Sequence, residues 1–189
     1  MTPPPRLLSG IMLGLAGGAI LVPLNSTMLA VALPSVTGEF GLGANTVSSL
    51  VTLYLGAVVV ALPASGSIGD RIGHRNAFLL GVIGFALSSL LAALAGTFIV
   101  LEAGRVGQAV AGALISTSSA ALLRELAPPE RRGEAFGLFG MLVSTSAAIG
   151  PLVGGLLVAA FGWRSLFFVA VPVALLAASV VGVVLRPRR

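Results

Sequence analysis

Long apolar runs alternate with short polar breaks along the whole chain. Six stretches are each long enough, at about 20 mainly apolar residues or more, to cross the hydrocarbon core of a bilayer as an α-helix. These stretches are residues 7–35, 47–68, 77–95, 98–123, 135–161 and 166–185. Backbone groups cannot stay unpaired in lipid, so the segments are predicted to be helices. The pattern therefore predicts an all-α integral membrane protein whose residues 1–189 form a single six-helix transmembrane bundle.

The composition supports lipid as the surrounding solvent. Hydrophobic residues make up 57% of the chain and charged residues 9%, whereas an ordinary soluble domain is about 25% charged. The chain has no cysteine and one histidine, His74, so no metal site is expected. It also has no lysine, which excludes the phosphate-binding loop of an ATP-driven pump. The net charge of +5 falls at the ends of apolar segments, so no nucleic-acid partner is expected.

The arginines predict the orientation of the bundle. All 11 basic residues are arginine, and most of them lie at the two termini and in the second and fourth breaks. The residues on that side are Arg6, Arg71, Arg75, Arg124, Arg131, Arg132, Arg186, Arg188 and Arg189. Only Arg164 lies on the other side, in the fifth break, and Arg105 lies inside a span. The positive-inside rule then predicts a multi-pass plasma-membrane protein with both termini in the cytoplasm.

The second break, residues 66–75, reads GSIGDRIGHR and concentrates charge in one short turn. A topology signal would explain its arginines but not its acid or its three glycines. The stretch resembles G-x-L-A-D-R-x-G-R-K, the signature loop of the major facilitator superfamily. The matching residues are Gly66, Asp70, Arg71, Gly73 and Arg75, and the departures are Ile68, Gly69 and His74.

Four further segments resemble motifs of that superfamily in the same order. LEAGRVGQAVAGA (101–113) is similar to R-x-x-Q-G through Arg105 and Gln108, although Ala109 replaces the usual glycine. GLFGMLVSTSAAIGPLVGG (137–155) resembles the exporters' motif in its fifth helix, and the matching residues are Gly137, Gly150, Pro151, Gly154 and Gly155. LNSTMLAVALP (24–34) and GWRSLFFVAVP (162–172) resemble segments of the branch of 14-helix drug:proton antiporters. The first of these keeps Thr27 but has Asn25 where that branch has an aspartate.

The resemblance implies the N-terminal half of a major facilitator transporter, built from two three-helix inverted repeats at 7–95 and 98–186. It implies a secondary active transporter, not an enzyme, that exports drugs or other small molecules by alternating access. The expected partners are a small-molecule substrate, the lipid bilayer, and a second transporter half or another copy of the chain. No cofactor is implied, although a proton gradient is a possible driving force. The alternatives are a nontransporting membrane scaffold or assembly subunit, and an inactive transporter fragment.

One polar group of five residues is expected to line the substrate or ion pathway: Asn25, Thr27, Glu102, Arg105 and Gln108. A charge inside a span costs about 2.5–3.5 kcal/mol, so Arg105 should face the bundle interior and have partners there. At about 1.5 Å per residue, Arg105 lies about 10 Å below Phe98 and Asn25 about 13 Å below Pro34, so their side chains can meet. Glu102 is either a proton carrier that responds to Arg105 or a salt-bridge partner near the outer surface, and we favour the second.

Two segments are expected to move during transport. Pro151 should bend its helix, which fits either a gating surface or a static kink. The resemblance to the exporters' motif favours the gating surface. In the superfamily, the aspartate of the signature loop latches one half onto a helix N-terminus of the other. The resemblance therefore implies a conformational switch at Asp70, with Arg71, Arg75, Arg124 and Arg131 available to hold it in place.

Overall fold

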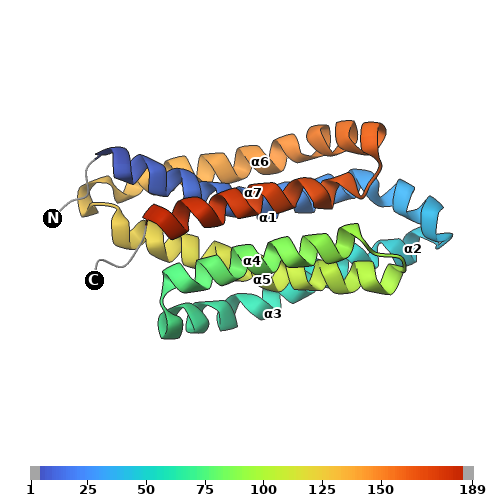
Figure 1. Ribbon diagram of the computed structural model, residues 1–189, viewed down its shortest axis with the longest axis horizontal. Coiled ribbons are helices and arrows are strands. Elements are labelled where there is room, and N and C mark those ends of the chain that lie inside the picture. Colours follow the sequence, from blue (N-terminus) through green and yellow to red (C-terminus); the bar gives the residue numbers. More distant parts are fainter. Residues whose placement is uncertain (1–4, 185–189) are drawn as a thin grey trace.

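The computed structural model describes the backbone of residues 5–184 and the side chains of residues 14–183. Its elements are α1 (Pro5–Phe40), α2 (Ala44–Val47), α3 (Ser49–Ile72), α4 (His74–Ala93), α5 (Phe98–Leu126), the 3₁₀ turn η1 (Pro129–Arg131), α6 (Arg132–Phe161) and α7 (Ser165–Val184). Six helical segments are long and apolar enough to cross a membrane (Figure 1). The described part of the chain contains no strand. The prediction of an all-α membrane fold is confirmed.

The first connection is shorter than the sequence predicts. The break expected over 36–45 is helical as far as Phe40, and only residues 41–43 separate α1 from α2. Helical hydrogen bonds continue through this stretch, since the Gly41 N–H donates to the Thr37 carbonyl at 3.0 Å. Gly41 ends the helix with φ +64°, a conformation that glycine adopts without steric cost. The expected end of the last span, residue 185, and the three C-terminal arginines lie outside the described residues.

The charged break at 66–75 is also tighter than expected. Helix α3 runs through Asp70 to Ile72 and α4 starts at His74, so a single residue, Gly73, makes the turn. Gly73 has φ +84°, which requires glycine. The prediction of a ten-residue turn is wrong because the helix persists through the polar residues. Gly66 and Gly69 therefore belong to the last turns of α3.

The helices pack with a regular exchange pattern. The neighbouring pairs of membrane-length helices are α1·α6, α3·α5, α4·α5, α1·α7, α4·α7, α1·α5, α3·α4, α6·α7 and α5·α6. Exchanging α1 with α5, α3 with α6 and α4 with α7 converts every pair except α5·α6 into a pair of the same set, and it leaves α1·α5 and α4·α7 unchanged. Two inverted three-helix repeats would produce such a pattern. The repeat boundaries themselves stay a prediction. The beginning of α1, the end of α7 and the α3–α4 turn lie at one end of the bundle (Figure 1).

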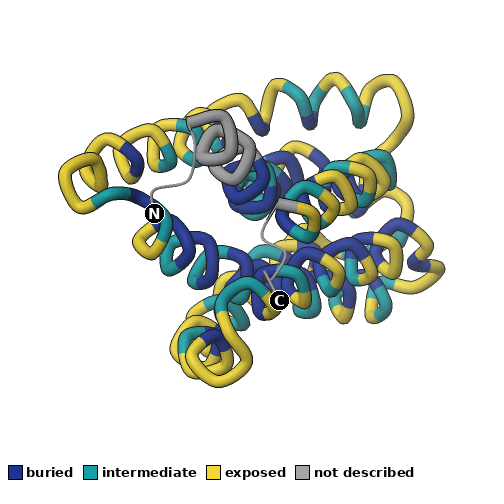
Figure 2. Tube along the Cα trace, turned by 60° about the vertical axis from the view of Figure 1, so that its left-hand side comes forward, coloured by how far each residue is buried: buried dark blue, intermediate teal, exposed yellow. Residues whose placement is uncertain are grey.

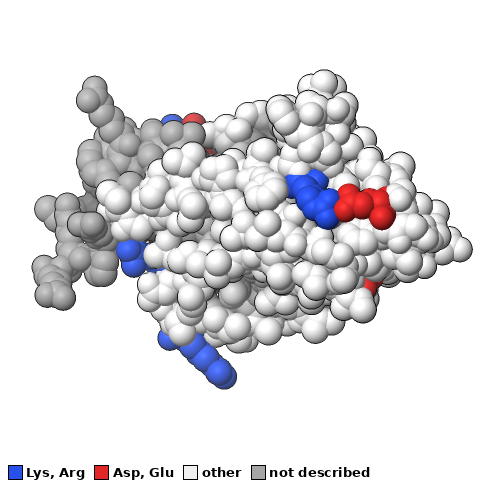
Figure 3. Space-filling view, turned by 45° about the vertical axis from the view of Figure 1, so that its right-hand side comes forward, with Lys and Arg blue, Asp and Glu red and all other residues white. Residues whose placement is uncertain are grey.

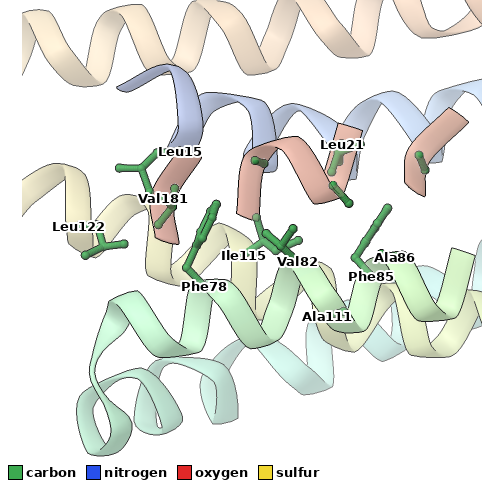
Figure 4. Close-up of a cluster of buried hydrophobic side chains, with 13 residues drawn as sticks. Leu15, Leu21, Phe78, Val82, Phe85, Ala86, Ala111, Ile115, Leu122 and Val181 are labelled. Carbon is green, nitrogen blue, oxygen red and sulfur yellow. The ribbon is translucent and has the colours of Figure 1, made fainter. Parts of the chain in front are cut away.

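Buried apolar side chains fill the space between α1, α4, α5 and α7 (Figure 4). Phe78 and Phe85 of α4 are fully buried there, together with Ile115 of α5 and Leu21 of α1. Close packing of this kind, rather than exclusion of water, holds helices together in lipid. Small residues make it possible: a Cβ at Gly18 would lie 2.5 Å from Cζ of the Phe78 ring.

Helices α3 and α6 flank the bundle and bury little of their surface. In the most apolar 18-residue stretch of α4, and in that of α5, 50% is buried inside the bundle. The buried share is 22% in the span that contains α3 and 17% in the span that contains α6. Figure 2 shows the exposed residues along the outward sides of the bundle. On the face in Figure 3, most atoms of the described residues belong to uncharged residues. Such apolar surface meets lipid or another apolar protein surface in a membrane.

Candidate functional site

A buried polar network surrounds Arg105, which is 1% exposed. Its Nη1 donates hydrogen bonds to Asn25 Oδ1 and to Gln108 Oε1, both at 2.8 Å. Its guanidinium carbon lies 4.1 Å from the centre of the Tyr54 ring, close enough for a cation–π interaction. Arg105 thus faces the bundle interior and meets Asn25, as the sequence predicts.

The network continues to two more helices. Gln108 Nε2 donates to Ser89 Oγ at 2.7 Å, and that hydroxyl donates to the Phe85 carbonyl at 2.7 Å. Asn25 Nδ2 lies 3.3 Å from the Leu166 carbonyl of α7. We call Asn25, Tyr54, Ser89, Arg105 and Gln108 the central network. It joins side chains of α1, α3, α4 and α5 to the backbone of α7.

The sequence did not identify Tyr54 and Ser89 as part of this site. Ser89 looks like any small residue of a membrane helix. Tyr54 could have been identified, since it is the only tyrosine of the chain and lies in an apolar segment. A buried tyrosine usually has a specific partner, and here that partner is the guanidinium.

No carboxylate belongs to the central network. The ion pairs among the described side chains are His74–Asp70, Arg131–Glu134 and Arg164–Glu39. Glu102 instead accepts a hydrogen bond from Ser49 Oγ, near the start of α3. The expected salt bridge between Glu102 and Arg105 is therefore wrong, because two amide oxygens occupy Nη1 and the carboxylate is held by a different helix. The Nε of Arg105 is buried and has no hydrogen-bond partner.

Thr27 and the glycines of α6 form a close helix contact. The Thr27 hydroxyl donates to the Pro23 carbonyl of its own helix at 2.9 Å. A Cβ added at Gly150 would lie 3.0 Å from Thr27 Cβ, and one at Gly154 would lie 2.9 Å from Met28 Cα. Only glycine allows α1 and α6 to approach this closely.

The remaining residues of the α6 motif lie elsewhere on the helix. Gly137 and Pro151 are exposed, and Gly155 is half-buried at ordinary contact distance from Val31. Gly150 and Gly154 thus make the tight contact with α1, whereas Gly137, Pro151 and Gly155 do not take part in it. A gating role for this helix stays a prediction.

The α3–α4 turn holds its charges at the surface. The Asp70 side chain is 77% exposed and its Oδ1 lies 3.5 Å from His74 Nε2. Arg75 Nη2 donates to the Gly182 carbonyl at 3.0 Å, and Arg131 pairs with Glu134. The expectation that these arginines hold Asp70 is therefore wrong for Arg75 and Arg131, which have other acceptors.

Two departures from the signature pattern fit one another. A Cβ added at Gly69 would lie 2.5 Å from Nδ1 and 2.9 Å from Cε1 of His74. The imidazole ring therefore occupies space that an alanine, usual at the position of Gly69, would fill. The pair places His74 Nε2 beside Asp70.

A cavity of about 530 Å³ opens beside this turn. It is lined by Gly66 and Asp70 of α3, His74 of α4, Thr117, Ala121, Arg124 and Glu125 of α5, and Arg132 of α6. Acidic and basic side chains are mixed on its walls. We call it the end cavity.

At the opposite end of the bundle, Glu39 and Arg164 together link α1, the α6–α7 turn and the end of α4. Trp163 Nε1 donates to Glu39 Oε2 at 2.7 Å, and Arg164 Nη1 does so at 2.7 Å. Arg164 Nη2 donates to the Ala95 carbonyl at 2.9 Å. The tryptophan and arginine of the 162–172 motif thus fasten the end of α1 to the end of α4. Glu39 was not predicted as part of a contact, because it lies in a stretch expected to be a loop.

Comparisons with known proteins agree with this architecture. The family model described as Major Facilitator Superfamily matches residues 15–189. The tetracenomycin C resistance and export protein of Streptomyces glaucescens is 40% identical over 174 residues, which cover 92% of this chain and 32% of that protein. The multidrug efflux pump LfrA of Mycolicibacterium smegmatis is 36% identical over 162 residues, which cover 85% of this chain and 32% of that protein.

Among solved structures, a peptide transporter POT in complex with sulfate superposes with a TM-score of 0.81. The match covers 92% of this chain and 37% of the transporter at 18% identity, so it shows a shared fold alone. The chain spans about a third of the length of the relatives it matches.

Proposed function

Because the chain belongs to the major facilitator superfamily, we propose that it forms the N-terminal half of a secondary active exporter of small molecules. The observation that carries the proposal is the 40% identity with a resistance and export protein over 92% of the chain. The multidrug efflux pump LfrA, at 36% identity, supports the same assignment. The reaction is then movement of a substrate across the bilayer without covalent chemistry.

The geometry supports alternating access. Superfamily substrates bind near the midplane of the bilayer at the interface between repeats. The position of Arg105, about 10 Å along the helix axis from Phe98, supports a substrate path beside the central network. The little-buried helices α3 and α6 offer apolar surface to a second half or another copy of the chain. The exposed Asp70 is free to reach a helix N-terminus of that partner.

The proposal includes an orientation with both termini and the α3–α4 turn in the cytoplasm. The chain contains no cysteine, so a single introduced thiol reports its own side of the membrane. Gly38 and Gly133 are both exposed and an added Cβ meets nothing at either one. In intact cells, an impermeant thiol reagent should label Gly38→Cys and not Gly133→Cys. Equal labelling of both variants would refute this orientation.

The export activity is tested in cells that express the chain from its native locus together with neighbouring genes. Deleting the chain should raise the intracellular accumulation of exported drugs, and restoring it should lower accumulation again. A protonophore should raise accumulation to the level of the deletion if a proton gradient drives export. Unchanged accumulation in the deletion strain would favour the alternatives, a nontransporting scaffold or an inactive fragment.

A further inference from the structure

The central network holds one positive charge that no acidic side chain neutralises. A guanidinium keeps its proton under all ordinary conditions. Its side-chain neighbours, Asn25, Gln108 and Tyr54, are neutral. The carboxylate of Glu102 is bonded to Ser49 instead. The ion pairs among the described residues all involve residues at the ends of helices.

The charge is held too firmly to act by direct contact. Arg105 is 1% exposed, and Asn25 and Tyr54 are 4% and 3% exposed. A substrate between the two halves would therefore meet the outer side of the network and not the guanidinium itself. Coulomb interactions need no contact, however, and in a medium of low dielectric constant they remain strong over many ångströms.

We infer that the central network makes this transporter selective for anionic small molecules over cationic ones. The inference rests on the proposed function, since it names the substrate class of that same site. A related site with an aspartate at the position of Asn25 would neutralise Arg105 and lose this selectivity. Arg105 is then a specificity-determining residue that acts through its field, and Asn25 is the residue that leaves its charge uncompensated.

The experiment compares two dyes that share the xanthene ring system, the anion carboxyfluorescein and the cation rhodamine 123. Inside-out membrane vesicles are prepared from cells that express the chain from its native locus. Uptake of each dye is measured under the same energisation, and vesicles from the deletion strain provide the background. The quantity compared is the ratio of anion uptake to cation uptake, which does not depend on the amount of folded protein.

The wild type should favour the anion. Asn25→Asp adds one negative charge 2.8 Å from Nη1 and should lower the ratio about tenfold, which corresponds to about 1.4 kcal/mol. Asn25→Ser disturbs the same hydrogen bond without adding charge and should leave the ratio within about twofold of the wild type. Gln108→Glu adds the charge from the other amide partner and should lower the ratio as Asn25→Asp does.

Three outcomes would overturn the inference and leave the proposed export activity standing. A wild type that prefers the cation would refute it directly. An unchanged ratio in whichever of the Asn25→Asp and Gln108→Glu variants folds would show that the charge does not select substrates. An equal shift in Asn25→Ser would show that shape, not charge, sets the ratio. Uptake of neither dye above background would instead refute the proposed export activity, and the selectivity with it.

Discussion

The central network and the α3–α4 turn both concentrate charge in a chain with few charged residues, but they hold it in opposite ways. Arg105 is 1% exposed and bonded to side chains that do not titrate. The Asp70 side chain is 77% exposed, and its Oδ1 lies 3.5 Å from Nε2 of the His74 imidazole. Enclosure thus fixes the partners of one charge, whereas exposure leaves the other free to exchange its partner.

The interactions that hold Arg105 are also stronger than the one that holds Asp70. Hydrogen bonds to a charged group contribute about 1.5–3 kcal/mol each, so the two bonds from Nη1 keep Arg105 in one position. An exposed ion pair contributes only about 0–1 kcal/mol, so the pairing of Asp70 with His74 is easily replaced. The central network is therefore suited to a constant feature of the site, and the turn to a switch between two states.

Replacing Arg105 should have the largest effect on transport. We expect Arg105→Leu to reduce export at least about 100-fold, while the melting temperature in detergent changes by only a few degrees. Leaving two amide oxygens unpaired costs about 1–3 kcal/mol each, but removing a buried charge also removes a desolvation penalty of several kcal/mol. Export assays and thermal unfolding of the purified transporter measure the two effects separately.

The matched control is an arginine at the surface. Arg131 is paired with Glu134, and both side chains are more than 65% exposed, at 69% and 68%. Arg131→Leu should change stability by less than about 1 kcal/mol and export by less than about twofold. If Arg105→Leu behaves like this control, the enclosed charge has no special role and the contrast between the two regions fails.

The fit between Gly69 and His74 predicts the next largest effect. Gly69→Ala brings a methyl group 2.5 Å from Nδ1 and should destabilise the chain by about 1–3 kcal/mol, the usual cost of overpacking. In a His74→Ala background the sign should reverse, because alanine stabilises a helix by about 0.5–1 kcal/mol relative to glycine. Thermal unfolding of the two single variants and the double variant gives the coupling energy. Additive effects would contradict the contact.

Asp70→Asn should have a moderate effect, and on transport alone. The side chain is exposed, so expression and melting temperature should match the wild type. A charge beside a helix N-terminus contributes about 0.3–2 kcal/mol, so losing it should slow export by about 2- to 30-fold. Transport assays at equal protein amounts test this. Wild-type rates in Asp70→Asn would leave the turn as a topology signal only.

The sequence predicts the fold well because its main signal is strong. Six apolar runs of membrane length can only be helices, so the element order follows directly. The ends of the helices are harder to predict, because polar residues do not by themselves stop a helix. The stretch from Thr37 to Phe40 and the residues before Gly73 stay helical, since their backbone groups still find partners one turn away.

The site is only partly predictable for a related reason. The cost of a charge in lipid requires that Arg105 have polar partners, and depth along the helix points to Asn25. Ser89, Tyr54 and Glu39 become partners only through the packing of distant helices. Glu102 is an expected partner that does not form the contact. It lies three residues before Arg105 on the same helix, but its carboxylate bonds to Ser49 of another helix.

The smallest effect is expected at Glu102, the residue that the sequence leaves between two roles. Its carboxylate accepts a hydrogen bond from the Ser49 hydroxyl, and an amide oxygen in Glu102→Gln can accept the same bond. Because Glu102 forms no ion pair with Arg105, losing its charge leaves the central network intact. We therefore expect substrate-driven proton movement in proteoliposomes of the complete transporter to stay within about twofold of the wild type, a difference of about 0.4 kcal/mol.

Asn25→Asp is the comparison variant, since it places an acid inside the network, and new or stronger proton movement there would show that the site lacks only the acid. Loss of proton movement in Glu102→Gln with substrate binding retained would instead make Glu102 the proton carrier. That result would place the proton carrier of this half outside the central network, toward the outer end of α5.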